Sequence, residues 1–229
     1  MDRTLMNGQK LNYRERVECV VCGLNERQRM ILASALRWSR LSRSRHIYIQ
    51  EFITLFFQVF DKIVLREFKS CCDLTGSEFL GWDKTSGNIY DNVRHEDVCR
   101  TSFMSGSVDL IISNDVYEHV PDIQAAFQEA YRILSDRGAM IFSVPFIFGE
   151  AQTKKRARLG ISKEIEFLEK PIYHDDPLNP DGALVFHDFG WDMLQQLKEA
   201  GFSDVFMLDG HDPTLGYFGG ICPFFVAQK

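Results

Sequence analysis

Polar side chains gather just after an apolar run in the segment SNDVYEHVPD, residues 113–122. The run before it, VDLIIS, has the continuous apolar character of a strand that is covered on both faces. In an open parallel sheet, ligands bind beyond the carboxyl ends of the strands. Asn114, Asp115 and His119 are therefore candidates to contact a cofactor.

Acids follow three other predicted strands in the same way. Glu51 follows HIYIQ, Glu78 follows the second strand with Ser77 beside it, and Asp97 ends the third in HEDV. The turn after the first strand, QEFITLF, has no glycine, and glycine is what allows backbone N–H groups to approach a pyrophosphate. The pattern disfavours a dinucleotide. It fits a cofactor with an adenosine, whose ribose and amine need acids, and a charged amino-acid tail.

Alternating strands and helices must position these groups. Helices are predicted at 24–41, 52–65, 122–138 and 190–202, the third stopped by a left-handed Gly138 and the last with Trp191, Leu194 and Leu197 facing inward. Strands are predicted at 46–50, 71–78, 93–98, 108–113, 139–146, 204–208 and 221–228. This order predicts an α/β, Rossmann-like, doubly wound sheet. We expect seven mostly parallel strands with an antiparallel C-terminal hairpin.

The chain of 229 residues divides into two predicted parts. Residues 1–46 form a basic arm with ten Lys/Arg and four Asp/Glu, whereas residues 47–229 form one acidic domain. Residues 149–189 interrupt the pattern and are longer than an ordinary loop, which predicts a lid or substrate-binding insertion. The arm suits either a phosphate-rich partner or a solvated helix face, and the acidic body makes nucleic acid an unlikely partner. Without an apolar span or a secretory segment, we expect a cytoplasmic protein.

Two cysteines have the spacing of a zinc knuckle. Cys19 and Cys22 form a CVVC motif, but a four-thiolate site needs a second close pair, which the sequence lacks. We therefore expect no metal site and reduced, packed thiols, while zinc held within a larger assembly stays open.

Residues 95–146, from HEDVCRTSF to IFSVPF, resemble the class I S-adenosylmethionine-dependent methyltransferases of the type 11-like branch. GSEFLG, YHDDP, FGWDML and GYFGG extend the resemblance over residues 47–229. The chain departs from the family in its glycine-poor first turn and in SDRG, where PGG is more common. The resemblance implies S-adenosylmethionine as the cofactor, held by these residues: Glu51 near the methionine end, Ser77 and Glu78 at the ribose, Asp97 and Val98 at the adenine, and Asn114, Asp115 and His119 at the opening where the methyl group is presented.

The implied function is methyl transfer to an oxygen or nitrogen of a small-molecule or glycan-like acceptor beneath the 149–189 insertion. An alcohol or amine acceptor must lose a proton, so a base is useful. His174, flanked by Asp175 and Asp176, is the first candidate; His119 lies at the same opening, and His187 is a further candidate. Two alternatives remain: a catalytically weakened regulatory or scaffold protein, and an RNA methyltransferase. The oligomeric state is not predicted.

Overall fold

The structure is a computed structural model that describes residues 14, 18–42, 45–67, 72–217 and 222–229. Cys71 of the predicted second strand and residues 218–220 of the GYFGG motif lie outside the described residues. The elements, in chain order, are α2 Glu26–Ser42, β1 His46–Ile49, α3 Leu55–Glu67, β2 Asp73–Gly76, β3 Ile89–Tyr90, β4 Val93–Arg94, β5 Val108–Asn114, the 3-10 helix η2 Tyr117–His119, α4 Ile123–Ile133, β6 Leu134–Ser143, β7 Lys154–Lys155, β8 Ala157–Leu159, β9 Ile165–Phe167, β10 Tyr173–His174, β11 Ala183–Leu184, β12 His187–Asp188, α5 Asp192–Glu199, β13 Asp204–Leu208, η3 Pro213–Leu215 and β14 Phe224–Gln228.

A mostly parallel sheet forms the centre of the fold. Its strands lie in the order β13-β14-β6-β5-β1-β2. The pairs β1–β2, β1–β5 and β5–β6 are parallel, and β14 pairs antiparallel with both β6 and β13. The predicted doubly wound α/β class with an antiparallel C-terminal hairpin is confirmed, and β1 and β5 meet where the chain changes direction across the sheet.

The predicted seventh strand is wrong for the described residues, whose central sheet has six strands. Residues 93–98 were predicted as the third strand of this sheet. Instead, Asp91 and Asn92 both adopt positive φ, as in a two-residue hairpin turn, and fold β4 back onto β3. A single bridge between Glu78 and His95 is the link that remains to the end of β2.

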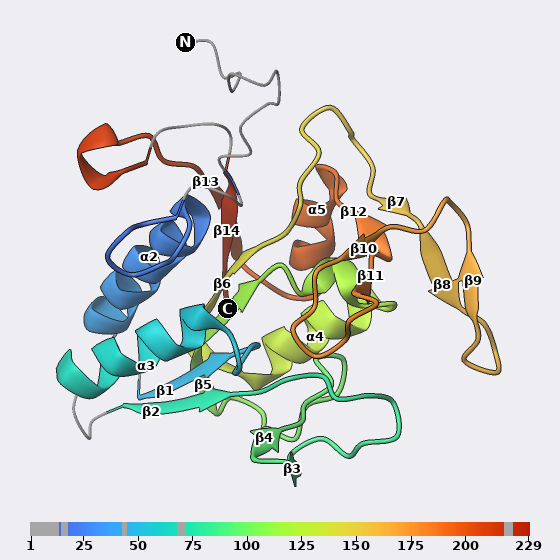
Figure 1. Cartoon of the computed structure of the whole chain (residues 1–229), viewed down its shortest axis with the longest axis horizontal. Coiled ribbons are helices and arrows are strands. Elements are labelled where there is room, and N and C mark those ends of the chain that lie inside the picture. The colour runs from blue at the N-terminus through green and yellow to red at the C-terminus, as the bar shows by residue number, and fades with distance from the viewer. Residues whose placement is uncertain (1–13, 15–17, 43–44, 68–71, 218–221) are drawn as a thin grey trace.

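Helices cover both faces of the sheet, α2 and α3 on one side and α4 and α5 on the other (Figure 1). Alternation along β5 explains this, because Ile111 packs with α4 and α5 while Leu110 and Ile112 pack with α2 and α3. Helix α2 thus contributes to the same core as the strands, through residues such as Ile31 and Ala35. The domain boundary at residue 46 stays a prediction.

Phe127 is a test of this core, because its ring is fully buried between Tyr117 and Phe142. Phe127→Ala should lower the free energy of unfolding by about 3–5 kcal/mol, since it removes a large apolar side chain and leaves a cavity. Urea denaturation followed by circular dichroism measures the change. Gln128→Ala, an exposed position on the same helix, should stay near the wild type; equal stability of the two variants would contradict this packing.

Two predicted helix ends are also corrected. Helix α4 ends at Ile133, and Gly138 lies inside β6 without a left-handed φ. A Cβ at Gly138 would lie 3.2 Å from the Asp109 carbonyl oxygen, so close approach to β5 explains the glycine. On α5, Met193 and Leu197 are buried. Trp191 precedes the first turn of the helix; one side of its ring packs on Phe146, and the residue is half-exposed.

The 149–189 insertion carries structure of its own. Short antiparallel pairs join β8 to β9, β10 to β11, and β7 to β12. The β8–β9 hairpin projects from the body, while β10 and β11 lie against it (Figure 1). Among the described residues, no helix combines the length and apolar character that crossing a membrane requires.

Candidate active site

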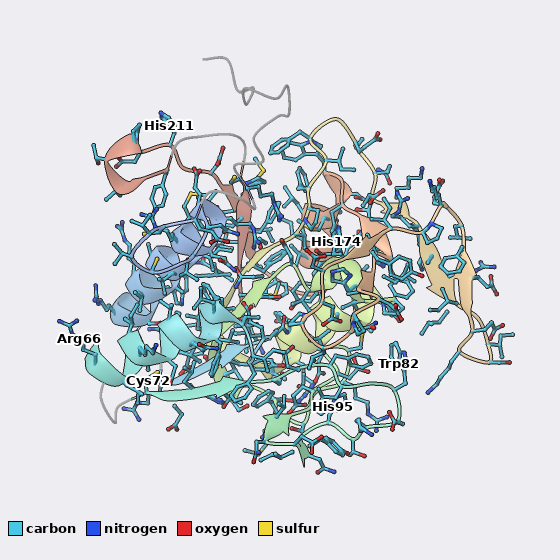
Figure 2. All side chains as sticks on the ribbon, in the orientation of Figure 1. Arg66, Cys72, Trp82, His95, His174 and His211 are labelled. Atoms are coloured by element: carbon cyan, nitrogen blue, oxygen red, sulfur yellow. The ribbon has the colours of Figure 1, made fainter. Side chains whose placement is uncertain are left out.

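A cavity of about 970 Å³ opens at the carboxyl ends of β1, β2 and β5. The loop from 173 to 183 forms another part of its wall. Figure 2 shows His174 near the middle of the molecule and Trp82, another lining residue, toward its edge. The cavity brings together all of the candidate site residues from the sequence except His187: Glu51, Ser77, Glu78, Asp97, Val98, Asn114, Asp115, His119 and His174.

Glu78 connects the second strand to the glycine-poor turn. Its Oε1 accepts hydrogen bonds from the backbone N–H groups of Phe52 (2.8 Å) and Ile53 (2.9 Å). Burial raises the pKa of the Glu78 carboxyl. One oxygen thus fixes the turn, and the other is not engaged by any hydrogen bond within the described residues. Glu78 can therefore organise the turn and still bind a ligand.

Asp97 and Val98 lie on the neighbouring wall. Asp97 Oδ1 accepts from the Cys99 backbone N–H at 2.9 Å, which fixes a tight turn and orients the carboxylate. Val98 packs against the core edge beside it. Phe79 and Trp82, which the sequence analysis did not single out, add aromatic faces to the cavity, with ring centroids 4.8 Å apart. This wall can enclose a flat ring.

Three residues at the ends of β1 and β5 offer side-chain oxygens that can accept hydrogen bonds: Gln50, Glu51 and Asn114. Asn114 donates a hydrogen bond to Glu51, and Asn114 Oδ1 and Gln50 Oε1 are buried without a hydrogen-bond partner among the residues that the structure describes. Burial raises the pKa of Glu51 to about 7. These oxygens can accept hydrogen bonds from a cationic group. Ser77, by contrast, uses its hydroxyl in a 2.7 Å hydrogen bond with Tyr48.

Asp115 is neutralised by two arginines. Arg14 donates to both carboxylate oxygens, at 2.9 and 2.6 Å, and Arg27 approaches within 3.0 Å. These guanidinium groups hold the pKa of Asp115 at about 2. Ser143 adds a further hydrogen bond. The sequence analysis placed Asp115 in the site but missed both arginines, since no local pattern shows that the arm reaches this cavity.

Glu118, His119 and His174 form a cluster, of which His119 and His174 line the cavity and Glu118 is buried behind them. Glu118 Oε1 lies 3.6 Å from His119 Nε2 and 3.5 Å from His174 Nδ1. The Glu118 side chain is completely buried, and its pKa is raised by burial. The pKa of His174 is raised by Glu118. The carboxylate facing His174 is thus Glu118, and not the adjacent Asp175 or Asp176 expected from the sequence.

His187, the further candidate base, does not line the cavity. It is buried in strand β12 and stacks on Phe189. Burial lowers its pKa to about 4, so it is neutral at physiological pH. Packing explains the position of His187. A single sequence does not distinguish such a packed histidine from a histidine in a loop.

A sequence family matches part of the chain. Residues 71–142 match the sequence family described as "Methyltransferase domain". This part of the chain is therefore similar to a methyltransferase domain. The matched segment runs from β2 through most of β6 and includes Glu78, Asp97 and Asn114. No curated protein matches the chain.

Solved structures share the fold of this methyltransferase domain at low sequence identity. The Burkholderia thailandensis 1,6-didemethyltoxoflavin-N1-methyltransferase, solved with 1,6-didemethyltoxoflavin and S-adenosylhomocysteine, is 12% identical with a TM-score of 0.50. The match covers 89% of this chain and 78% of that one. An S-adenosylmethionine-dependent methyltransferase from Mesorhizobium loti is 15% identical over 86% of this chain and 100% of that one, with a TM-score of 0.47.

Proposed function

We propose that this protein transfers a methyl group from S-adenosylmethionine to an oxygen or nitrogen of a small-molecule or glycan-like acceptor. The observation that carries the proposal is the single cavity that is lined both by Glu78, Asp97 and Glu51 and by His119 and His174. One end of this cavity has the groups that an adenosine with an amino-acid tail needs. The other end has the groups that a proton-losing acceptor needs.

The cofactor end fits the proposal through its unpaired acceptors. Within the described part of the chain, Gln50 Oε1 and Asn114 Oδ1 are buried and have no hydrogen-bond partner, which is costly unless a donor such as an ammonium group occupies the cavity. Glu51 beside them can supply a negative charge. S-adenosylmethionine, when bound, supplies an electrophilic methyl group on a sulfonium centre. We assign the ammonium end of the cofactor to these three residues.

The adenosine would lie along the neighbouring wall. The free oxygen of Glu78 is suited to accept hydrogen bonds from ribose hydroxyls, and Asp97 is suited to accept from the adenine amine. Val98 and Phe79 offer apolar surface for the ring. The Ser77 hydroxyl is already engaged in its hydrogen bond with Tyr48 and would not contact the ligand. Ser77 would instead support this wall and position Glu78.

The acceptor would lie beneath the loop that carries His174. Tyr173 and Leu178, both exposed, line the cavity together with Asp175 and Asp176. Aromatic and carboxylate groups together suit a neutral, hydroxyl-bearing molecule, because carboxylates accept hydrogen bonds from hydroxyls. The 149–189 insertion is therefore the proposed determinant of acceptor choice.

RNA is a weaker candidate acceptor, because cations of the basic arm have partners inside the protein. Arg14 and Arg27 contact Asp115, and Arg29 donates to backbone carbonyls near Tyr217, over whose ring it also lies. Phosphate binding requires several cations that are available to a polyanion. A cytoplasmic location is compatible with the proposal and stays a prediction.

The pH dependence of S-adenosylhomocysteine binding tests the cofactor assignment. Since the pKa of Glu51 is about 7, roughly a tenth of Glu51 is charged at pH 6 and about nine tenths at pH 8. An ammonium group prefers the charged form, so affinity should rise up to about tenfold between these pH values. Isothermal titration calorimetry on the wild type and Glu51→Gln measures this rise.

The variant separates Glu51 from the other titrating groups of the cavity. Glu51→Gln keeps an oxygen that can accept from Asn114 but cannot ionise, so its affinity should vary much less between pH 6 and pH 8. An equal rise in both proteins would move the ammonium site away from Glu51. If the wild type binds no S-adenosylhomocysteine at either pH, the regulatory or scaffold alternative replaces the methyltransferase proposal.

A further inference from the structure

The Glu118–His119–His174 cluster has the spacing of ligands around one ion. The candidate ligand atoms are a Glu118 carboxylate oxygen, His119 Nε2 and His174 Nδ1, all within 4.8 Å of one another. In a tetrahedral zinc site with bonds near 2.0–2.1 Å, neighbouring ligand atoms lie about 3.3–3.5 Å apart. The two separations from Glu118, 3.6 Å to His119 and 3.5 Å to His174, agree with this value, and the two histidine nitrogens lie within 4.8 Å of each other.

Glu118 is poorly served by the protein alone. Both of its oxygens are buried, and among the described residues neither has a hydrogen bond, although His119 and His174 lie within ion-pair distance. A buried carboxylate without a hydrogen bond is costly, and a histidine 3.5 Å away lies too far for a good hydrogen bond. A protonated His174 would neutralise the charge of Glu118 but would not explain the spacing of the three side chains. A cation among the three side chains would satisfy Glu118 fully.

His119 is oriented as metal ligands usually are. Its Nδ1 lies 2.8 Å from the Leu184 carbonyl oxygen, which can only accept, so Nδ1 carries the proton. In the neutral imidazole, Nε2 is then the atom with a free lone pair, and it lies 3.6 Å from Glu118 Oε1. Metal-bound histidines typically donate their second N–H to a carbonyl or carboxylate in this manner. The β11 backbone thus holds His119 ready to ligate.

We propose that Glu118, His119 and His174 bind a divalent transition-metal ion of the Zn²⁺ class. Two imidazoles and one carboxylate are a donor set that suits Zn²⁺ and its neighbours, and three protein ligands leave a position open toward the cavity. Resting on the proposed function, the ion would hold an acceptor hydroxyl at this position and lower its pKa. Metal binding itself does not depend on that function.

Co²⁺ is a suitable probe, because it takes zinc sites and absorbs visible light when four-coordinate. Metal-free full-length protein should bind one Co²⁺ with a visible absorption band, and Zn²⁺ should displace it. Glu118→Gln and His174→Ala should each weaken binding at least tenfold. Glu118→Gln keeps nearly the same side-chain shape, and His174→Ala changes a residue at the cavity surface. Both variants should therefore fold, and each tests the metal site independently of the other.

Two control variants define the site. His211→Ala should bind Co²⁺ like the wild type, since this exposed histidine lies well away from His174 (Figure 2). Cys22→Ser should also keep the band, which excludes the CVVC motif as its source. A band that survives in Glu118→Gln and His174→Ala, or no binding by the wild type, would overturn the metal site.

Titration of S-adenosylhomocysteine into the same proteins separates the two proposals. Cofactor binding without Co²⁺ binding would remove the metal site and leave the proposed function standing, with His174 returned to the role of base. Co²⁺ binding without cofactor binding would keep the metal site and remove the proposed function.

Discussion

Replacing Glu78 by alanine should weaken the binding of S-adenosylhomocysteine at least tenfold, about 1.4 kcal/mol. The variant loses the proposed acceptor for the ribose hydroxyls. It also releases the Phe52 and Ile53 N–H groups, which hold the turn after β1 in place. Both effects act in the same direction. Isothermal titration calorimetry at pH 8, where Glu51 is mostly charged, measures the loss.

Glu78→Gln separates the two effects of Glu78. The amide oxygen can still accept from the turn, but the second oxygen becomes a donor, so we expect a loss smaller than that of Glu78→Ala. Asp83→Ala is the matched control, because this exposed acid lies nearby and pairs only with Lys84 among the described residues. If Glu78→Ala binds as tightly as Asp83→Ala, the ribose does not rest on Glu78.

Replacing His174 by alanine should lower the rate of methyl transfer about 100-fold or more. The variant removes the proposed base or metal ligand at the acceptor, and such groups typically contribute 10²–10⁴-fold. The affinity for S-adenosylhomocysteine should change less than twofold, because His174 makes none of the proposed ribose and ammonium contacts. The measurement is S-adenosylhomocysteine formation with a panel of hydroxyl- and amine-bearing acceptors.

His211→Ala serves as the control for activity. It removes an exposed histidine outside the cavity and should keep the wild-type rate. A His174→Ala protein that keeps the wild-type rate with the best acceptor of the panel would exclude His174 from the reaction. Loss of both the rate and cofactor binding would instead indicate a disturbed cavity and would contradict a role confined to the acceptor end.

The glycine-poor turn has a physical explanation in the structure. A glycine-rich turn brings backbone N–H groups toward a ligand, but here the carboxylate of Glu78 uses the N–H groups of Phe52 and Ile53. The wall that remains is made of acceptors, including Gln50 and Asn114. Such a wall suits a cation better than a phosphate. The departure from the family pattern therefore fits an ammonium-bearing ligand.

Periodicity in the sequence was sufficient for most of the fold. The apolar run VDLIIS is a strand covered on both faces, and the stripe through Ile123 and Phe127 is a helix on the core. It was insufficient for residues 93–98, where the turn at Asp91 and Asn92 redirects the chain into a local hairpin. Short strands depend on turn geometry more than on apolar pattern.

The sequence by itself determined which residues border the cavity from the strand ends, because the carboxyl ends of parallel strands meet at one edge of a sheet. Only the tertiary structure decided their partners. Arg14 reaches Asp115 across 101 positions, and Glu118 faces His174 rather than leaving that histidine to its neighbouring acids. Contacts of this kind depend on how an insertion and an N-terminal segment pack onto the sheet, and local residue patterns carry no record of that packing.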